Sequence, residues 1–244
     1  MTLPGGQSPE KDLNDALDNV FNHANFGPFM GRQLIQRRVT SNPSPAYIQR
    51  VAATFANDGA NVRGDLKAVV QAVLLDPEAR AASAPAANYG KQREPVIRFA
   101  TFLRALGAKS QNGINSIHYL NGADQALGQS PLLSPSVFNF YSPNFRQPGT
   151  VAKAGLYSPE FQIATETSVV GSLKFFASFL NDEGGGSGDS RLKLDLTALQ
   201  TLAATPTALV DRLDALSIAY QMSGSTRTRL TTMMGALPGE HSLL

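Results

Sequence analysis

Apolar residues recur at every third or fourth position along much of this 244-residue chain, and no series of segments alternates apolar with polar residues as sheet strands do. Between residues 8 and 107 this helical spacing appears in five separate segments. Two of them open with serine followed by proline, at Ser8 and Pro9 and at Ser44 and Pro45, which is typical of an N-cap and first helical position. The sequence therefore predicts an N-terminal helical subdomain over residues 8–107.

The helical spacing is lost over residues 108–158, which are rich in Ser, Asn, Gly and Pro. These roughly 50 residues far exceed the usual loop of about 4 to 6 residues, so we expect one long ordered loop across the helices. Four aromatic side chains lie in it: Phe138, Phe140, Tyr141 and Phe145. Such rings either anchor a loop to the core or form the face of a sugar- or peptide-binding site, and both alternatives stay open.

Helical spacing returns at residues 159–181, which predict one long helix with an apolar stripe made of Val170, Leu173, Phe176, Ala177 and Leu180. The glycine-rich run 184–188 predicts a hinge. Further helices are predicted after Thr205 and from Ser225 to about Leu237, so residues 159–237 should form a C-terminal helical layer. The predicted fold is all-α, an irregular multi-helix bundle of about eight or nine helices with one long ordered loop.

Several classes of site are excluded by the residues that the chain lacks. Without cysteine it forms no disulfide, holds no thiolate-bound metal and uses no cysteine nucleophile. Its three histidines, His23, His118 and His241, lack the spacing that places two ligands on one helix face, so no metal site is predicted. Serine-nucleophile and phosphate-loop motifs are missing, and no cofactor is predicted.

Charge and hydropathy limit the partners. The net charge is +2, and the basic residues are scattered through the predicted helices, so no nucleic-acid partner is expected. No apolar run approaches the ~18 residues that a membrane span needs, and no signal peptide is visible before the first helix.

Two carboxylates are candidate catalytic residues. Glu166 lies four residues before Val170, at the end of the predicted apolar stripe, and Glu160 lies near the start of the same helix. A buried carboxylate has a raised pKa, which is the usual route to a general acid, and the two could act as a pair. The alternative is that Glu160 interacts with the positive N-terminus of the helix and Glu166 binds an arginine.

Two arginines are candidate ligand-binding residues. Glu94 and Arg98 are four residues apart on a predicted helix, a spacing typical of a surface ion pair. In the alternative interpretation Arg93 or Arg98 points toward the long loop and binds an anionic ligand, as guanidinium groups do for carboxylates and phosphates.

Several long strings resemble one family, DUF1800, a group of uncharacterised bacterial exported proteins. They are LDNVFNHANFGPFMGRQLIQRRVTSNPSPAYIQRVAATF, RGDLKAVVQAVLLDPEAR, GKQREPVIRFATFLRALGA, SPSVFNFYSPNFRQPG, LYSPEFQIATE and ALVDRLDALSIAYQMS. Their order and spacing resemble the C-terminal half of the family over most of the chain. The resemblance implies a longer protein with an additional N-terminal half, export to the periplasm or the outside, and a possible co-exported partner related to sulfatases. It assigns no biochemical activity.

Two functions of different class follow as hypotheses. The first is a non-enzymatic exported binding or assembly protein, a fragment of a larger chain, that holds a partner or a surface polymer. The alternative is part of an enzyme acting on an extracellular polymer, with catalytic groups shared with the missing N-terminal half and with Glu160, Glu166 and Arg98 contributing from this side. Convergence of Glu166 and Arg98 with the loop aromatics would favour a ligand site or an enzyme.

Overall fold

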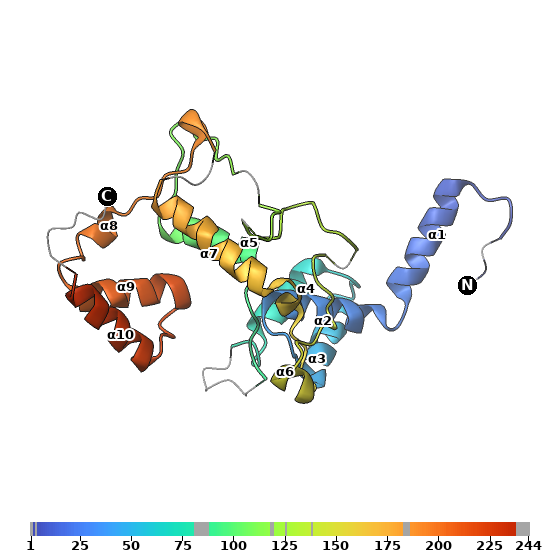
Figure 1. Ribbon diagram of the computed structural model, residues 1–244. Helices are drawn as coiled ribbons and strands as arrows, with labels where there is room; N and C mark the ends of the chain where they lie inside the picture. The colour runs from blue at the N-terminus through green and yellow to red at the C-terminus, as the bar shows by residue number, and fades with distance from the viewer. Residues whose placement is uncertain are drawn as a thin grey trace. The chain divides into compact units, whose positions relative to one another are not determined.

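A computed structural model describes residues 2, 4–80, 88–117, 120–124, 126–137, 139–182 and 186–237. Over these residues the protein is helical, with one isolated antiparallel bridge between Lys109 and Lys193 and no sheet (Figure 1). The predicted all-α fold is therefore confirmed. Contacts between Cα atoms group the chain into two compact units: unit 1 is Met1–Gln92 with Tyr141–Gln162, and unit 2 is Arg93–Phe140 with Ile163–Leu244.

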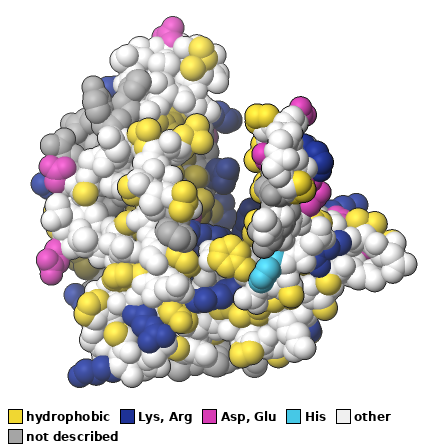
Figure 2. Space-filling model, turned by 90° about the vertical axis from the view of Figure 1, so that its right-hand side faces the viewer, with side chains coloured by type: hydrophobic (Ala, Val, Ile, Leu, Met, Phe, Trp, Pro, Cys, Tyr) yellow, Lys and Arg dark blue, Asp and Glu magenta, His cyan; other side chains and the backbone are white. Residues whose placement is uncertain are grey.

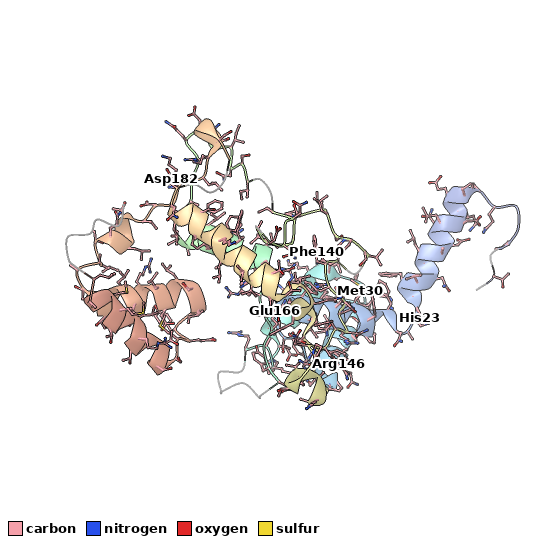
Figure 3. The ribbon with its side chains drawn as sticks, in the orientation of Figure 1. His23, Met30, Phe140, Arg146, Glu166 and Asp182 are labelled. Carbon is pink, nitrogen blue, oxygen red and sulfur yellow. The ribbon has the colours of Figure 1, made fainter. Side chains whose placement is uncertain are left out.

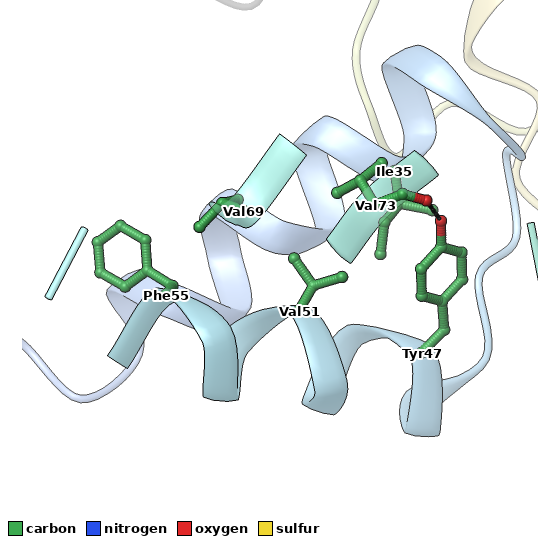
Figure 4. Close-up of a cluster of buried hydrophobic side chains, with 6 residues drawn as sticks. All are labelled: Ile35, Tyr47, Val51, Phe55, Val69 and Val73. Carbon is green, nitrogen blue, oxygen red and sulfur yellow. Dashed lines mark hydrogen bonds between the residues drawn. The ribbon is translucent and has the colours of Figure 1, made fainter. Parts of the chain in front are cut away.

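The core of unit 1 lies among three helices, α2 (Phe26–Arg38), α3 (Pro45–Ala56) and α4 (Leu66–Leu75). The side chain of Ser44 caps α3 by accepting a hydrogen bond from the backbone N–H of Tyr47, as its Ser-Pro start predicts. Tyr47 in turn donates its hydroxyl hydrogen to the backbone oxygen of Val73, which ties α3 to α4. Six buried side chains form the core (Figure 4): Ile35, Tyr47, Val51, Phe55, Val69 and Val73.

Helix α1 (Pro9–Asn22) carries the other predicted Ser-Pro start, and Ser8 accepts a hydrogen bond from Lys11 N–H. None of its residues is buried, and an apolar stripe of Leu13, Leu17 and Val20 is more than half exposed. Figure 2 shows apolar side chains reaching one face of the molecule between basic and acidic ones. None of the helices in the described ranges is long and apolar enough to cross a membrane.

Part of the long loop is ordered within unit 1 by hydrogen bonds to the turn after α2. Asn42 donates from Nδ2 to the backbone oxygen of Tyr157 at 2.9 Å and accepts from the Tyr157 N–H at 2.8 Å. Gln36, buried on α2, donates to the backbone oxygen of Pro143 at 3.3 Å. The loop also contains a short helix, α6 (Thr150–Lys153), and ends in the 3-10 helix η1 (Pro159–Ile163).

Unit 2 contains α5 (Pro95–Ala105), α7 (Glu166–Leu180), the 3-10 helix η2 (Gly188–Ser190), α8 (Thr197–Gln200), α9 (Pro206–Ile218) and α10 (Gly224–Gly235). Phenylalanine rings from α5 and α7 pack at centroid distances of 4.9 to 6.5 Å, most of them edge-on or tilted. The rings are those of Phe99, Phe102, Phe175, Phe176 and Phe179.

The prediction of a single helix over residues 159–181 was wrong, because the chain breaks between η1 and α7. Thr165 is extended, and its side chain caps α7 by accepting a hydrogen bond from Ser168 N–H. Ser168 also donates its hydroxyl hydrogen to the backbone oxygen of Ile163 at 2.6 Å. These local side-chain bonds stabilise the break.

The predicted apolar stripe of α7 forms the buried face only in part, because Phe176 packs against the core of unit 2 while other members of the stripe are exposed. Val170 and Leu173 are more than half exposed, whereas Gly171 and Ser172 are buried. A Cβ atom on Gly171 would lie 2.8 Å from the carbonyl carbon of Asp124. The backbone of the loop thus packs directly on the small residues of α7, which turns the neighbouring apolar side chains outward.

Candidate functional site

A cavity of about 1230 Å³ lies among the described residues of unit 2. This exceeds the range of roughly 300–1,000 Å³ that is usual for small-molecule sites. The walls come from α5, α7, α8, α9 and α10 and are predominantly apolar. They include Phe102, Leu106, Phe176, Leu180, Leu199, Leu209, Leu213, Leu216 and Met234. A space of this kind suits a long apolar molecule.

The start of α5 is fixed by Gln129 from the loop. Gln129 donates from Nε2 to a carboxylate oxygen of Glu94 at 2.5 Å and accepts from Val96 N–H through Oε1 at 3.1 Å. Glu94 therefore bonds the loop, and the ion pair predicted between Glu94 and Arg98 is not formed. This contact orients the first turn of α5 and leaves Arg98 without its sequence neighbour as counter-ion.

Arg93 and Arg98, the two arginines singled out in the sequence, both line the cavity. Arg93 is exposed, whereas Arg98 is half-buried and its Nε atom is buried without a hydrogen-bond partner. Burial lowers the pKa of Arg98 from its ordinary value, because desolvation disfavours the charged form. No carboxylate among the described residues forms an ion pair with Arg98. The cavity thus combines apolar walls with two arginines that form no ion pair with a described residue, and Arg98 is the more buried of the two.

A buried carboxylate stabilises the part of the wall that α9 and α10 form. Asp214 on α9 is completely buried and accepts hydrogen bonds from the Met222 N–H at 3.0 Å and from the guanidinium of Arg227 on α10. Between the two helices the chain turns through Ala219 and Tyr220, both at positive φ. These contacts set the α9–α10 hairpin and so position Leu213 and Leu216 in the wall.

The two candidate carboxylates have different environments. Glu160 is 1% exposed in unit 1, and one of its oxygens lies 2.7 Å from Nζ of Lys91, which also donates to the backbone oxygen of Arg37 at 2.9 Å. Glu166, in unit 2, is exposed in the first turn of α7 (Figure 3) and forms no ion pair with a described residue. The expected burial of Glu166 is therefore wrong, and the buried carboxylate is Glu160.

The four loop aromatics divide between the two units. Phe140 is half-buried in unit 2, and Phe145 is half-buried in unit 1. Tyr141 is 2% exposed in unit 1, with the guanidinium of Arg37 at 4.3 Å from its ring centroid. Tyr141 has the surroundings expected of an anchor for the loop. Phe138 lies outside the described residues.

The histidines do not form a metal site within the described ranges, where no three His, Cys, Asp or Glu side chains come together to hold an ion. His23 follows α1 (Figure 3), and its Nδ1 accepts a hydrogen bond from Asn25 N–H at 3.1 Å. His118 and His241 lie outside the described residues, as do Gly184 and Gly185 of the predicted hinge.

Arg98 was predicted from the sequence as a lining residue of a site, but the leucines of α8 and α9 that line the same cavity were not. The spacing of Leu209, Leu213 and Leu216 is equally typical of a helix face buried in a core, so the sequence gives no sign that they line a cavity.

Comparison with known proteins gives the family and no activity. No curated protein and no solved structure matches the chain. The model of one family, DUF1800, described as a protein of unknown function, matches residues 2–242, nearly the whole chain. The chain therefore belongs to the DUF1800 family.

Proposed function

We propose that this protein is a non-enzymatic, exported binding protein whose unit 2 cavity holds an amphipathic anion. The apolar body of the ligand lies against the leucines and phenylalanines of the wall, and its negative group meets Arg98. Export is proposed from the family resemblance alone.

The single observation that supports this proposal is the state of Arg98. A half-buried guanidinium without a counter-ion is destabilising, because part of its hydration is lost and no hydrogen bond replaces it at the buried Nε. A ligand carboxylate or sulfate would supply the missing charge and a bidentate hydrogen bond. The apolar walls then account for the rest of the ligand.

The alternative of an enzyme that uses the two candidate carboxylates has less support. Glu166 is exposed in unit 2, whereas Glu160 is buried in unit 1 with its charge paired to Lys91, and neither residue lines the unit 2 cavity.

The proposal predicts how the protein distinguishes two probes of equal chain length, a fluorescent long-chain fatty acid and the corresponding neutral alcohol. In a fluorescence titration the wild type should bind the acid more tightly. Arg98→Gln should weaken binding of the acid by roughly 10- to 100-fold, equivalent to about 1.5 to 3 kcal/mol, and leave the alcohol unchanged.

The matched control is Arg104→Gln, an exposed arginine on the same helix that does not line the cavity. It should bind both probes as the wild type does. Equal affinity of the wild type for acid and alcohol, or an equal loss for both probes in Arg98→Gln, would contradict the proposal.

A further inference from the structure

A second cationic feature lies in unit 1, around Tyr157. The guanidinium carbon of Arg32 is 4.8 Å from the centroid of the Tyr157 ring, and that of Arg146 is 4.6 Å from the same centroid. Arg32 comes from α2, and Arg146 precedes α6 (Figure 3). Two segments more than a hundred residues apart in sequence thus place two positive charges on one aromatic ring.

No acidic group balances these charges. Neither arginine forms an ion pair with a carboxylate of the described residues. The sequence explains this, because it contains no Asp or Glu between Asp18 and Asp58 or between Asp124 and Glu160. Hydrogen bonding from Arg146, together with the charges of Arg32 and Arg146, lowers the pKa of Tyr157 below its ordinary value. The local potential is therefore positive.

Hydrogen bonds within the protein hold Tyr157 and Arg32 in place. The backbone of Tyr157 is fixed at both its N–H and its carbonyl by the side chain of Asn42. Arg32 donates from Nη2 to Oδ1 of Asn144 at 2.8 Å. The next residue, Ser158, donates its N–H to the backbone oxygen of Phe145 at 2.8 Å and accepts from the Gln147 N–H at 2.7 Å. These bonds fix Arg32 and the backbone of Tyr157, whose ring both guanidinium groups contact.

We propose that Arg32, Arg146 and Tyr157 form a binding site for a tetrahedral oxyanion, a phosphate or sulfate group. Two guanidinium groups can share one doubly charged group that carries several acceptor oxygens, and the Tyr157 hydroxyl adds a polar contact. Arg146 is exposed and Arg32 and Tyr157 are half-buried, so the group can arrive from solvent. It can be a free anion or an ester on a larger molecule, since the chemistry of recognition is the same.

The test uses equilibrium dialysis of radiolabelled inorganic phosphate against the full chain. The wild type should bind one equivalent saturably, with a Kd on the order of 1 mM or tighter. Arg146→Gln and Arg32→Gln should each weaken binding by at least about tenfold. The control Arg38→Gln, an exposed arginine at the end of α2, should stay within about twofold of the wild type.

Competition separates the two sources of the group. If dextran sulfate displaces the bound phosphate and uncharged dextran does not, the site accepts esters on a polymer; if only inorganic sulfate displaces it, the site takes the free anion. Either result supports the site.

Failure of the wild type to bind phosphate saturably up to about 10 mM, or equal losses of affinity in Arg146→Gln and Arg38→Gln, would overturn the proposed oxyanion site. This outcome is independent of the unit 2 cavity, which the fatty-acid titration measures.

Discussion

Two arginines of this protein illustrate two different uses of a guanidinium group. Arg50 donates from Nε and Nη2 to the two carboxylate oxygens of Asp76, at 2.6 and 2.8 Å, in a bidentate pair. Arg98 has no such partner, although its Nε is buried. The first arrangement satisfies both charges within the fold and therefore contributes to stability. The second leaves a half-buried charge that no described carboxylate balances, and the proposed function rests on this.

The Arg50–Asp76 pair predicts a pH-dependent contribution to stability. The hydrogen bonds from Arg50 hold the pKa of Asp76 below its ordinary value, so the contribution is complete above the unfolded-state pKa of about 3.9 and is lost as the pH falls toward the folded-state pKa. Asp76→Asn should lower the free energy of unfolding by about 1.5 to 3 kcal/mol at pH 7.

Urea denaturation at several pH values measures this effect. The difference between wild type and Asp76→Asn should shrink below pH ~4, where Asp76 of the unfolded chain is protonated. The control Asp18→Asn, at an exposed position on α1, should have the same free energy of unfolding as the wild type at every pH. A difference that is constant from pH 7 to pH 3 would show that the ion pair is not its cause.

At the scale of the helix, the ends are set by local side-chain chemistry and could be predicted. Ser8 and Ser44 cap α1 and α3 as their sequence signatures indicate, because a cap involves only residues close in sequence. The buried face of α7 could not be predicted, because it depends on the close approach of Gly171 to backbone about fifty residues earlier. The absence of an ion pair between Arg98 and Glu94 could not be predicted either, because it depends on the hydrogen bond that Glu94 accepts from Gln129.

The C-terminal end of α9 predicts a stabilising substitution. Ala219 is left-handed, at φ 53° and ψ 48°, a conformation in which a Cβ costs roughly 1 to 2 kcal/mol. Ala219→Gly should therefore raise the free energy of unfolding by about 0.5 to 1 kcal/mol. Ala215→Gly, in the interior of the same helix, should lower it by about 1 kcal/mol. Thermal unfolding followed by far-UV circular dichroism tests both, and equal effects of the two glycines would refute the cap argument.

At the scale of the whole molecule, each unit is built from two separate stretches of chain, so the chain passes between units near residues 92, 140 and 162. This interleaving is not visible in the sequence, where residues 141–158 look like the continuation of one loop. Its basis is a small set of long-range hydrogen bonds, of which those between Asn42 and Tyr157 span 115 residues. Helical periodicity carries no information about such contacts.

Removing one of these contacts should affect one unit and not the other. Asn42→Ala loses both hydrogen bonds to Tyr157, leaving a partly buried N–H and carbonyl unsatisfied, so we expect a loss of about 1 to 3 kcal/mol in unit 1. Amide hydrogen exchange should become faster in α3 and in residues 141–162 while α7 keeps its protection. Equal acceleration in α7 would mean that the two units open together.

Binding of an amphipathic anion in the unit 2 cavity can be tested by photo-crosslinking with a fatty acid that carries a diazirine at the end of its chain, followed by peptide mapping. We expect labelling of the cavity walls, in peptides from α5 and α9 that contain Phe102, Leu106, Leu213 or Leu216. We also expect that Arg98→Gln greatly reduces this labelling. Labelling concentrated on the exposed stripe of α1, at Leu13 and Leu17, and unchanged in Arg98→Gln would show that the protein binds such molecules only through surface apolar groups and would contradict the account.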